Sequence, residues 1–223
     1  MSRLFPQRPT LLAALTTLGV LGQSALNTGA QAVTFAGLNI TPRGEQKLNL
    51  ETGATELPQG GTAVDSGSGM KLVASRMQLR PGQSLIAQNA TLTTRQGGTL
   101  KAAQVTYDLK GGTVVASGGA TYHDSRFEAL SAPGMALYLK SGFVTAGGGV
   151  KAQRPALNAS GLVFDPNTMQ VLLTGPAQVS QSGVRANTAA GGRLVMVFGG
   201  SRLLRATSTP DNVTLARFRP YLK

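Results

Sequence analysis

The stretch from Leu100 to Val179 decides the fold of this chain. It begins LKAAQVTY at residues 100–107, passes through a glycine turn and continues VVASGGA at residues 114–120. The same order of strand, turn and return strand restarts near Phe127 and again near Leu157. A fixed repeat of short strands and glycine turns is typical of stacked architectures, in which each unit packs on its neighbours.

Two landmarks keep the period of this repeat at about 28 residues. One is an alanine two positions after an apolar residue, and it falls at Ala74, Ala102, Ala129, Ala159 and Ala186. The other is a small residue that closes a β-branched run, and it falls at Ala87, Ala116, Ala146 and Thr174. The period predicts an all-β chain, an elongated antiparallel meander folded over on itself. A parallel β-helix and a β-sandwich are the alternatives.

Within each unit, apolar and polar residues alternate, which predicts half-buried strands. One phase places Ala103, Val105, Tyr107 and Leu109 on the same side. Each repeat is therefore expected to add a V-shaped layer with an apolar concave face. Residues 131–134 and 188–192 interrupt the alternation and are expected to form bulges. The predicted concave lining comprises Met77, Leu79, Leu85, Val105, Tyr107, Val114, Val144, Leu162, Phe164 and Leu172.

The segment 33–70 differs from the repeats and is expected to cap one end of the stack. Residues 33–40 and 46–50 are expected to form two strands, and residues 59–69, rich in Gly, Ser and Thr, a mobile loop. The capping segment and residues 71–223 are expected to form a single domain, which is within the usual size of one all-β domain.

Residues 1–32 have the three parts of a secretory signal peptide. Arg3 and Arg8 supply a basic start, an apolar run covers residues 11–21, and Ala30-Gln31-Ala32 offers a cleavage site. Cleavage is expected after Ala32, because the apolar run is shorter than the ~20 residues that span a bilayer. Retention as an anchor is the alternative. The segment predicts export to the periplasm or another part of the cell envelope.

The composition is basic and free of cysteine. Charged residues make up 13% of the chain, and the formal charge is +12, which the loss of Arg3 and Arg8 would lower by two to +10. Such a field attracts anionic headgroups or polymers. Nucleic acid is not an expected partner, because the basic residues are scattered without interleaved aromatic residues. Without cysteine, disulfides, thiolate metal sites and cysteine nucleophiles are excluded.

The sequence contains few candidates for catalysis. The single histidine, His123, stands beside Asp124 and Ser125. Consecutive residues on a strand point apart and form no triad, so a polar turn is the expected role. A zinc site lacks further histidine or cysteine ligands. The glycines at 147–149 precede no helix and no Walker lysine, so they are expected in a turn. No catalytic residue, metal site or cofactor is predicted.

The repeat resembles the periplasmic lipopolysaccharide-transport proteins of the LptA, LptC and OstA-like class. The similarity lies in Leu-x-Ala-x-x-Val-x-Tyr at residues 100–107, followed by Val-x-Ala-x-Gly-x-Ala at 114–120, and it extends from about Leu72 to Arg205. The resemblance implies a β-jellyroll that is open like a taco. Its groove would hold the acyl chains of lipopolysaccharide or another envelope glycolipid, and edge strands would join it end to end with itself or with other transport-bridge proteins.

The sequence therefore predicts a lipid-binding or lipid-transport bridge protein of the envelope, without catalysis. Burial of acyl methylenes in an apolar groove stabilises such a complex by about 0.8 kcal/mol each. One alternative is a non-catalytic structural or surface-polymer-binding β-solenoid with a filled core. Another is an envelope hydrolase that uses His123 or a carboxylate.

Overall fold

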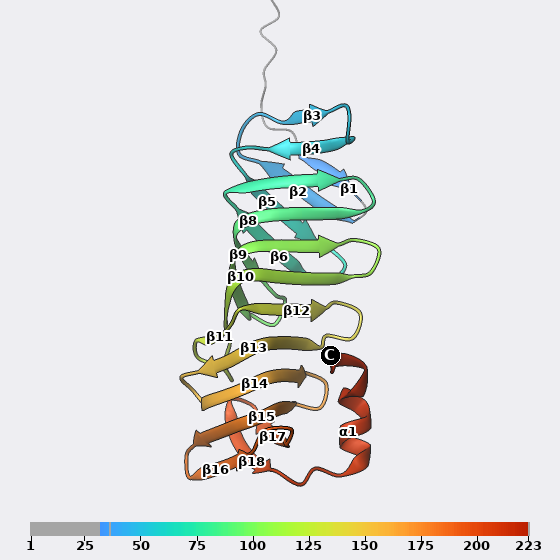
Figure 1. Cartoon of the computed structure of the whole chain (residues 1–223). Helices are drawn as coiled ribbons and strands as arrows, with labels where there is room; N and C mark the ends of the chain where they lie inside the picture. The colour runs from blue at the N-terminus through green and yellow to red at the C-terminus, as the bar shows by residue number, and fades with distance from the viewer. Residues whose placement is uncertain (1–31, 36, 223) are drawn as a thin grey trace, which may run out of the picture.

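The structure, a computed structural model, describes residues 32–35 and 37–222. Its strands form one 18-stranded sheet in which every pairing is antiparallel. They stack one above another from the N-terminal to the C-terminal end, and a single helix lies beside the lower strands (Figure 1). The predicted all-β, elongated antiparallel class is confirmed, and the described strands do not form a parallel β-helix. The predicted signal segment lies outside the described residues, except for Ala32.

The strands differ in length, and the longest belong to the repeats. Their bounds are β1 Val33–Phe35, β2 Leu38–Pro42, β3 Lys47–Asn49, β4 Ala54–Leu57, β5 Gly61–Asp65, β6 Met70–Ala74, β7 Arg76–Arg80, β8 Ser84–Thr93, β9 Thr99–Asp108, β10 Thr113–His123, β11 Leu130–Ala132, β12 Gly134–Tyr138, β13 Val144–Ala152, β14 Ala156–Asp165, β15 Gln170–Gln181, β16 Val184–Thr188, β17 Arg193–Gly199 and β18 Arg202–Thr207. Near the C-terminus, helix α1 spans Asn212–Phe218 and a short 3₁₀ helix spans Arg219–Tyr221.

The long strands bend near their middle. Where β9 pairs with β10, the register skips at Gly118 and Gly119, which both lie opposite Ala103. Both glycines have positive φ angles, 74° and 87°, a conformation that glycine adopts without steric cost. Gly148 and Gly149 interrupt the register of β13 and β14 in the same way, with φ angles of 78° and 98°. Gly118, Gly119, Gly148 and Gly149 are therefore bulge residues that bend the sheet, and the turn expected at residues 147–149 is wrong, because these residues lie inside β13.

These bends fold the sheet into two halves that face each other. The helix-side half contains β4, β7, β12, β17 and the parts of β8, β9, β10, β13, β14 and β15 that pair with them. The far half contains β1, β2, β5, β6, β11, β16 and the remaining parts of the same long strands. The predicted V-shaped layers are present. We call the open side, opposite the bends, the mouth.

The main hydrophobic core lies between the two halves and runs from Leu38 to Leu203. Val105 and Tyr107 are buried in it, as the alternation predicts, but Ala103 is exposed. On the other side of the bend, Leu100 and Ala102 take the inward positions. A single alternating phase across this strand is therefore wrong, because the irregular register at the bend shifts the inward positions by one residue.

A second cluster lies on the outer face of the helix-side half. Phe218 of α1 and Tyr221 of the 3₁₀ helix cover Phe143, Val163 and Val195 together with Leu172. The ring centroids of Phe143 and Tyr221 are 4.1 Å apart with the rings nearly parallel, and Phe143 meets Phe218 edge to face at 6.1 Å. The helix was not predicted, because it follows the last repeat. It buries a sheet face that would otherwise expose these aromatic and β-branched residues to water.

The N-terminal cap differs from its prediction in two places. Residues 33–40 were expected as one strand, but β1 and β2 form a tight hairpin in which Val33 pairs with Ile40. Residues 59–69 were expected as a loop, but Gly61–Asp65 forms β5, which pairs with both β2 and β6. Small residues such as Gly61 and Ala63 suit this strand, because Gly61 lies against the backbone of Thr41, where a Cβ atom would clash. The second expected strand is present as β3.

Candidate functional site

A cavity of about 240 Å³ opens at the mouth between the two halves. Its walls are mostly apolar, formed by Leu92 and Leu100 from the far half and by Met135, Leu137, Val144 and Phe164 from the helix-side half. Ser68, Thr94 and Gln96 add polar groups, and Arg95 and Arg126 are the charged residues of the lining. The volume lies just below the range of typical small-molecule pockets, about 300–1,000 Å³.

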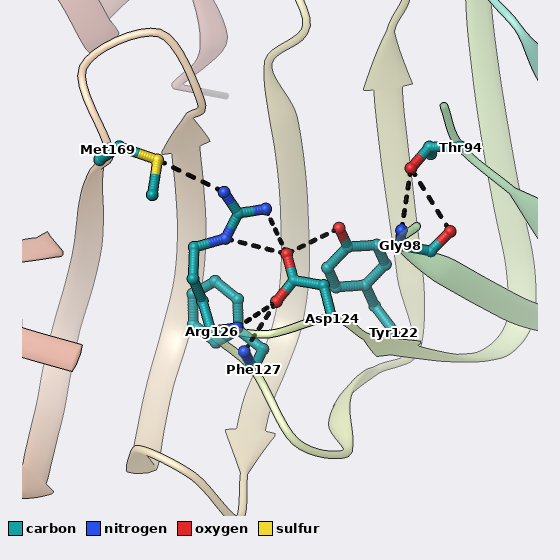
Figure 2. Close-up of polar contacts among 7 residues, drawn as sticks. All are labelled: Thr94, Gly98, Tyr122, Asp124, Arg126, Phe127 and Met169. Atoms are coloured by element: carbon teal, nitrogen blue, oxygen red, sulfur yellow. Dashed lines mark hydrogen bonds and ion pairs between the residues drawn. The ribbon is translucent and has the colours of Figure 1, made fainter. Parts of the chain in front are cut away.

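A loop of residues 124–129, between β10 and β11, is organised around a buried carboxylate (Figure 2). One oxygen of Asp124 accepts hydrogen bonds from the backbone N–H groups of Arg126 and Phe127, at 2.7 and 2.8 Å. The other accepts from the Tyr122 hydroxyl at 3.0 Å and from Nε and Nη2 of Arg126. The Asp124 and Arg126 side chains are 3% and 10% exposed. Such a buried ion pair requires this full set of hydrogen bonds.

This loop leaves the far half at the end of β10, contacts the helix-side half and returns to the far half at β11, and we call it the crossing loop. Phe127, 1% exposed, packs edge to face against Phe164 at 6.0 Å and Phe198 at 5.4 Å. The Arg126 guanidinium lies 4.5 Å from the centre of the Phe164 ring, and its Nη1 donates to the Met169 sulfur at 3.4 Å. These contacts close the mouth at the level of the lower strands.

A second contact crosses the mouth above the cavity. The hydroxyl of Tyr107, on β9 of the helix-side half, donates to Oδ2 of Asp65, on β5 of the far half, at 3.0 Å. Burial works to raise the pKa of the Asp65 carboxyl, but hydrogen bonds from Ser68, Tyr107 and Gly67 outweigh it and hold the pKa below its usual range. Burial, the bond to Asp65 and the charge of that carboxylate raise the pKa of Tyr107 to about 12.

This contact predicts a loss of stability at high pH. The pKa of Tyr107 is raised in the folded protein, so its contribution is complete below pH ~10, the unfolded value, and is lost as pH rises toward 12. We expect the free energy of unfolding to fall between these values, and Tyr107→Phe to remove part of that dependence, because burial and Asp124 also raise the pKa of Tyr122. At neutral pH the variant should lose about 1.5–3 kcal/mol, typical of a hydrogen bond to a charged group. Denaturant unfolding at several pH values, with tyrosinate absorbance alongside, measures both. An equal alkaline loss in Tyr107→Phe would contradict the assignment.

The cavity also depends on the turn between β8 and β9. Thr94 closes this turn, because its backbone N–H donates to the Gly98 carbonyl at 2.9 Å and its hydroxyl accepts from the Gly98 N–H at 3.1 Å. The Tyr122 ring packs so closely on Gly98 that a Cβ atom there would lie 2.9 Å from the ring. The turn holds Arg95 at the edge of the mouth, where its side chain is exposed and lies over Gly69.

The predicted lining residues lie mostly in the packed interior rather than along an open groove. Val144 and Phe164 line the cavity. Val144 is half-buried. Seven others are buried in the main core between the halves: Met77, Leu79, Leu85, Val105, Tyr107, Val114 and Leu162.

Leu172 is on the opposite face from the one predicted. It packs in the outer cluster under α1, whereas its neighbours Val171 and Leu173 point into the main core. This strand has apolar residues on both faces. The outer face is apolar because helix α1 covers it. The residues that sequence reasoning missed are Arg95, Tyr122, Asp124 and Arg126, because their roles depend on contacts between the two halves.

The residues around His123 do not form a catalytic arrangement. His123 is exposed at the end of β10, and the Asp124 carboxylate is occupied by Tyr122, Arg126 and backbone N–H groups. Across residues 32–35 and 37–222, no group of three or more His, Cys, Asp or Glu residues is placed to hold a metal ion. The helices in this described part of the chain are too short to cross a membrane.

Fold and site together define the class as an elongated antiparallel β-jellyroll, with an apolar interior between two half-sheets and a cavity at its mouth. The chain is similar to a crystal structure of LptH from Pseudomonas aeruginosa, described as the LptA-homologous periplasmic component of the conserved lipopolysaccharide transport device. The identity is 13%, the TM-score is 0.43, and the match covers 49% of this chain and 81% of that one. No protein family matches the sequence, and no curated protein does.

Proposed function

We propose that this protein binds the acyl part of an amphipathic envelope lipid, lipopolysaccharide or another glycolipid, between its two half-sheets and passes it along them. The observation that carries the proposal is one contiguous apolar interior along the stack, which meets solvent at a cavity in the mouth. Apolar concave sites of this kind are the usual places where proteins bind lipophilic ligands. The protein acts in this proposal as a non-catalytic binding module.

The construction of the sheet supports a change between closed and open states. Backbone hydrogen bonds run along each half and around the bends, whereas the contacts that cross the mouth are made by side chains such as Tyr107 and Arg126. The halves can therefore separate at the mouth without breaking a strand ladder. The packed interior is the closed state in this proposal, and acyl chains replace side-chain contacts in the open state.

Charge at the mouth suits anionic headgroups. The helix-side edge carries Arg80 at the end of β7 and Lys110 and Lys140 in turns, and Arg95 lies on the far edge. All four side chains are exposed, and together they favour phosphate or carboxylate groups that stay in water while the chains are buried. Action on such a partner agrees with a periplasmic protein that is exported by its N-terminal segment, and we include both in the proposal.

The ends of the stack offer edge strands for pairing with a second copy or with other bridge proteins. The N-terminal end presents β1 and β3, and the C-terminal end presents β16 and β18. At the C-terminal end the Leu203 N–H of β18 donates to the Gln181 side chain at the end of β15 at 3.1 Å, which links β18 to the far half. Unpaired strand edges are templates for β-augmentation.

Lipid that copurifies with the protein tests this function. We expect solvent extraction of protein purified from the envelope without detergent, followed by mass spectrometry, to release an acylated lipid. Val144→Asp should reduce the amount of bound lipid at least fivefold. The carboxylate would line the cavity, and burying it against an acyl chain would weaken binding by several kcal/mol. Val115→Asp is the matched control, because Val115 is 44% exposed on the outer face of β10. Folded wild-type protein without lipid, or equal amounts in both variants, would contradict the proposal.

A second function is favoured by the outer face of the far half. Four polar residues lie directly opposite one another on four neighbouring strands there, namely Lys151, Asn158, Gln178 and Asn187. The last three of them line a shallow hollow. A row of amides with a cation suits hydrogen bonding to a surface polymer, as in a structural or polymer-binding role. Lipid-free preparations that sediment with insoluble envelope polysaccharide would favour it over lipid binding.

A further inference from the structure

We infer that the cavity at the mouth is a binding site for one short-chain anionic amphiphile, with its chain between the half-sheets and its head at Arg95. This inference deepens the proposed function and rests on it, because it names the chemical class of ligand that the closed state accepts. It follows from the charges, the size and the boundaries of the cavity.

The charges of the cavity favour an anion. Its lining contains two arginines and no acidic residue. The Arg126 charge is compensated by Asp124, which binds it through two nitrogen atoms. In the described part of the chain, no carboxylate oxygen lies within salt-bridge distance of Arg95. The uncompensated charge at the cavity is therefore that of Arg95, and Thr94, Gln96 and Ser68 supply further polar groups beside it.

The size of the cavity sets the length of the chain. At about 30 Å³ for a group the size of water or methylene, its 240 Å³ holds about eight such groups. The Leu92, Leu100, Met135 and Leu137 side chains provide apolar walls for them. A bulky multi-chain lipid does not fit, so the closed state selects a single short chain.

The boundaries of the cavity limit further growth of the chain. The crossing loop closes the mouth on one side through Phe127 and Arg126, and the bond between Tyr107 and Asp65 crosses it on the other. A longer chain must displace one of these contacts before it reaches the packed interior. The affinity is therefore expected to rise with chain length and then to level off once the chain fills the cavity.

Calorimetric titration of the purified full chain with a homologous series tests the inference. The probes are hexanoate, octanoate, decanoate and dodecanoate, each below its micelle concentration, with octyl phosphate and octyltrimethylammonium for the head. We expect one site, with affinity rising about fourfold per methylene up to about eight carbons and then levelling off. Octanoate and octyl phosphate should both bind, and the ammonium amphiphile should bind at least tenfold more weakly.

Two variants locate the site. Arg95→Glu should weaken octanoate binding about tenfold, because it removes an attraction and adds a repulsion. Arg202→Glu is its matched control, an exposed arginine on β18 at the C-terminal end of the stack, and should change affinity less than twofold. Val144→Phe should abolish binding by filling the cavity, while circular dichroism shows a folded protein.

The outcomes separate this inference from the proposed function. No binding of short chains, no preference for anions, or equal effects of the two glutamate variants would overturn the inference. Affinity that keeps rising through dodecanoate would also overturn it, because the chain would then occupy the interior, as the proposed function requires. Octanoate binding by protein that carries no envelope lipid would uphold the inference and contradict the proposed function.

Discussion

Replacing Asp124 with asparagine is expected to lower the free energy of unfolding by about 3–5 kcal/mol, the usual cost of breaking a buried ion pair from one side. The variant leaves the Arg126 guanidinium without its counter-charge at a position where the side chain is 10% exposed. It also places an amide where Oδ2 accepts from Tyr122 and Arg126. Urea unfolding followed by circular dichroism measures the loss.

A double-mutant cycle identifies the cause of that loss. Arg126→Met in the Asp124→Asn background removes the uncompensated charge and retains an apolar stem over Phe164. We expect the double variant to recover more than half of the lost stability, because replacing both members of a buried pair is often nearly neutral. An additive effect of the two changes would show that the residues do not act as a pair.

Replacing Phe127 with alanine is expected to cost about 3–5 kcal/mol, the range for a fully buried phenylalanine. The ring is 1% exposed and contacts Phe164 and Phe198, so its removal leaves a cavity where the crossing loop enters the core. Thermal and urea unfolding measure the effect. Val213→Ala, at a residue 76% exposed on α1, should change stability by no more than about 0.5 kcal/mol.

Phe218→Ala separates the stability of the protein from the size of its binding site. Phe218 is as buried as Phe127, but it packs in the outer cluster under α1. Both variants should be destabilised by similar amounts. Phe127→Ala alone should let longer carboxylates bind, because only that cavity adjoins the interior between the half-sheets. A loss below about 1 kcal/mol for Phe127→Ala would show that the crossing loop does not close the mouth.

The repeat from Leu100 to Val179 was sufficient to predict the fold class. Its period of two within strands and its glycines at fixed places predicted antiparallel, half-buried strands in V-shaped layers, and the structure has them. Prediction failed where local pattern is ambiguous. The inward positions shift at the bend near Ala103, and Leu172 faces outward, since a strand with two apolar faces does not reveal which one a distant helix covers.

The candidate site was less predictable than the fold. The sequence predicts only a polar turn at Tyr122, Asp124 and Arg126. The spacing of these residues does not indicate that the turn folds into the core. Their arrangement requires Phe164, Met169 and Phe198, which lie about 40 to 70 residues further along the chain. Long-range contacts of this kind leave no periodic pattern in the sequence from which they could be predicted.

The sequence by itself determined a stack of antiparallel strands with apolar concave faces, because strand alternation and glycine turns depend on neighbouring residues and on backbone sterics. Only the tertiary structure decided whether that concave side is open. The side chains of the two half-sheets pack against each other, and the crossing loop and the bond between Tyr107 and Asp65 close most of the mouth. This packing follows because burying apolar surface against apolar surface is favourable wherever the facing side chains can meet. A cavity with Arg95 at its edge remains at the mouth.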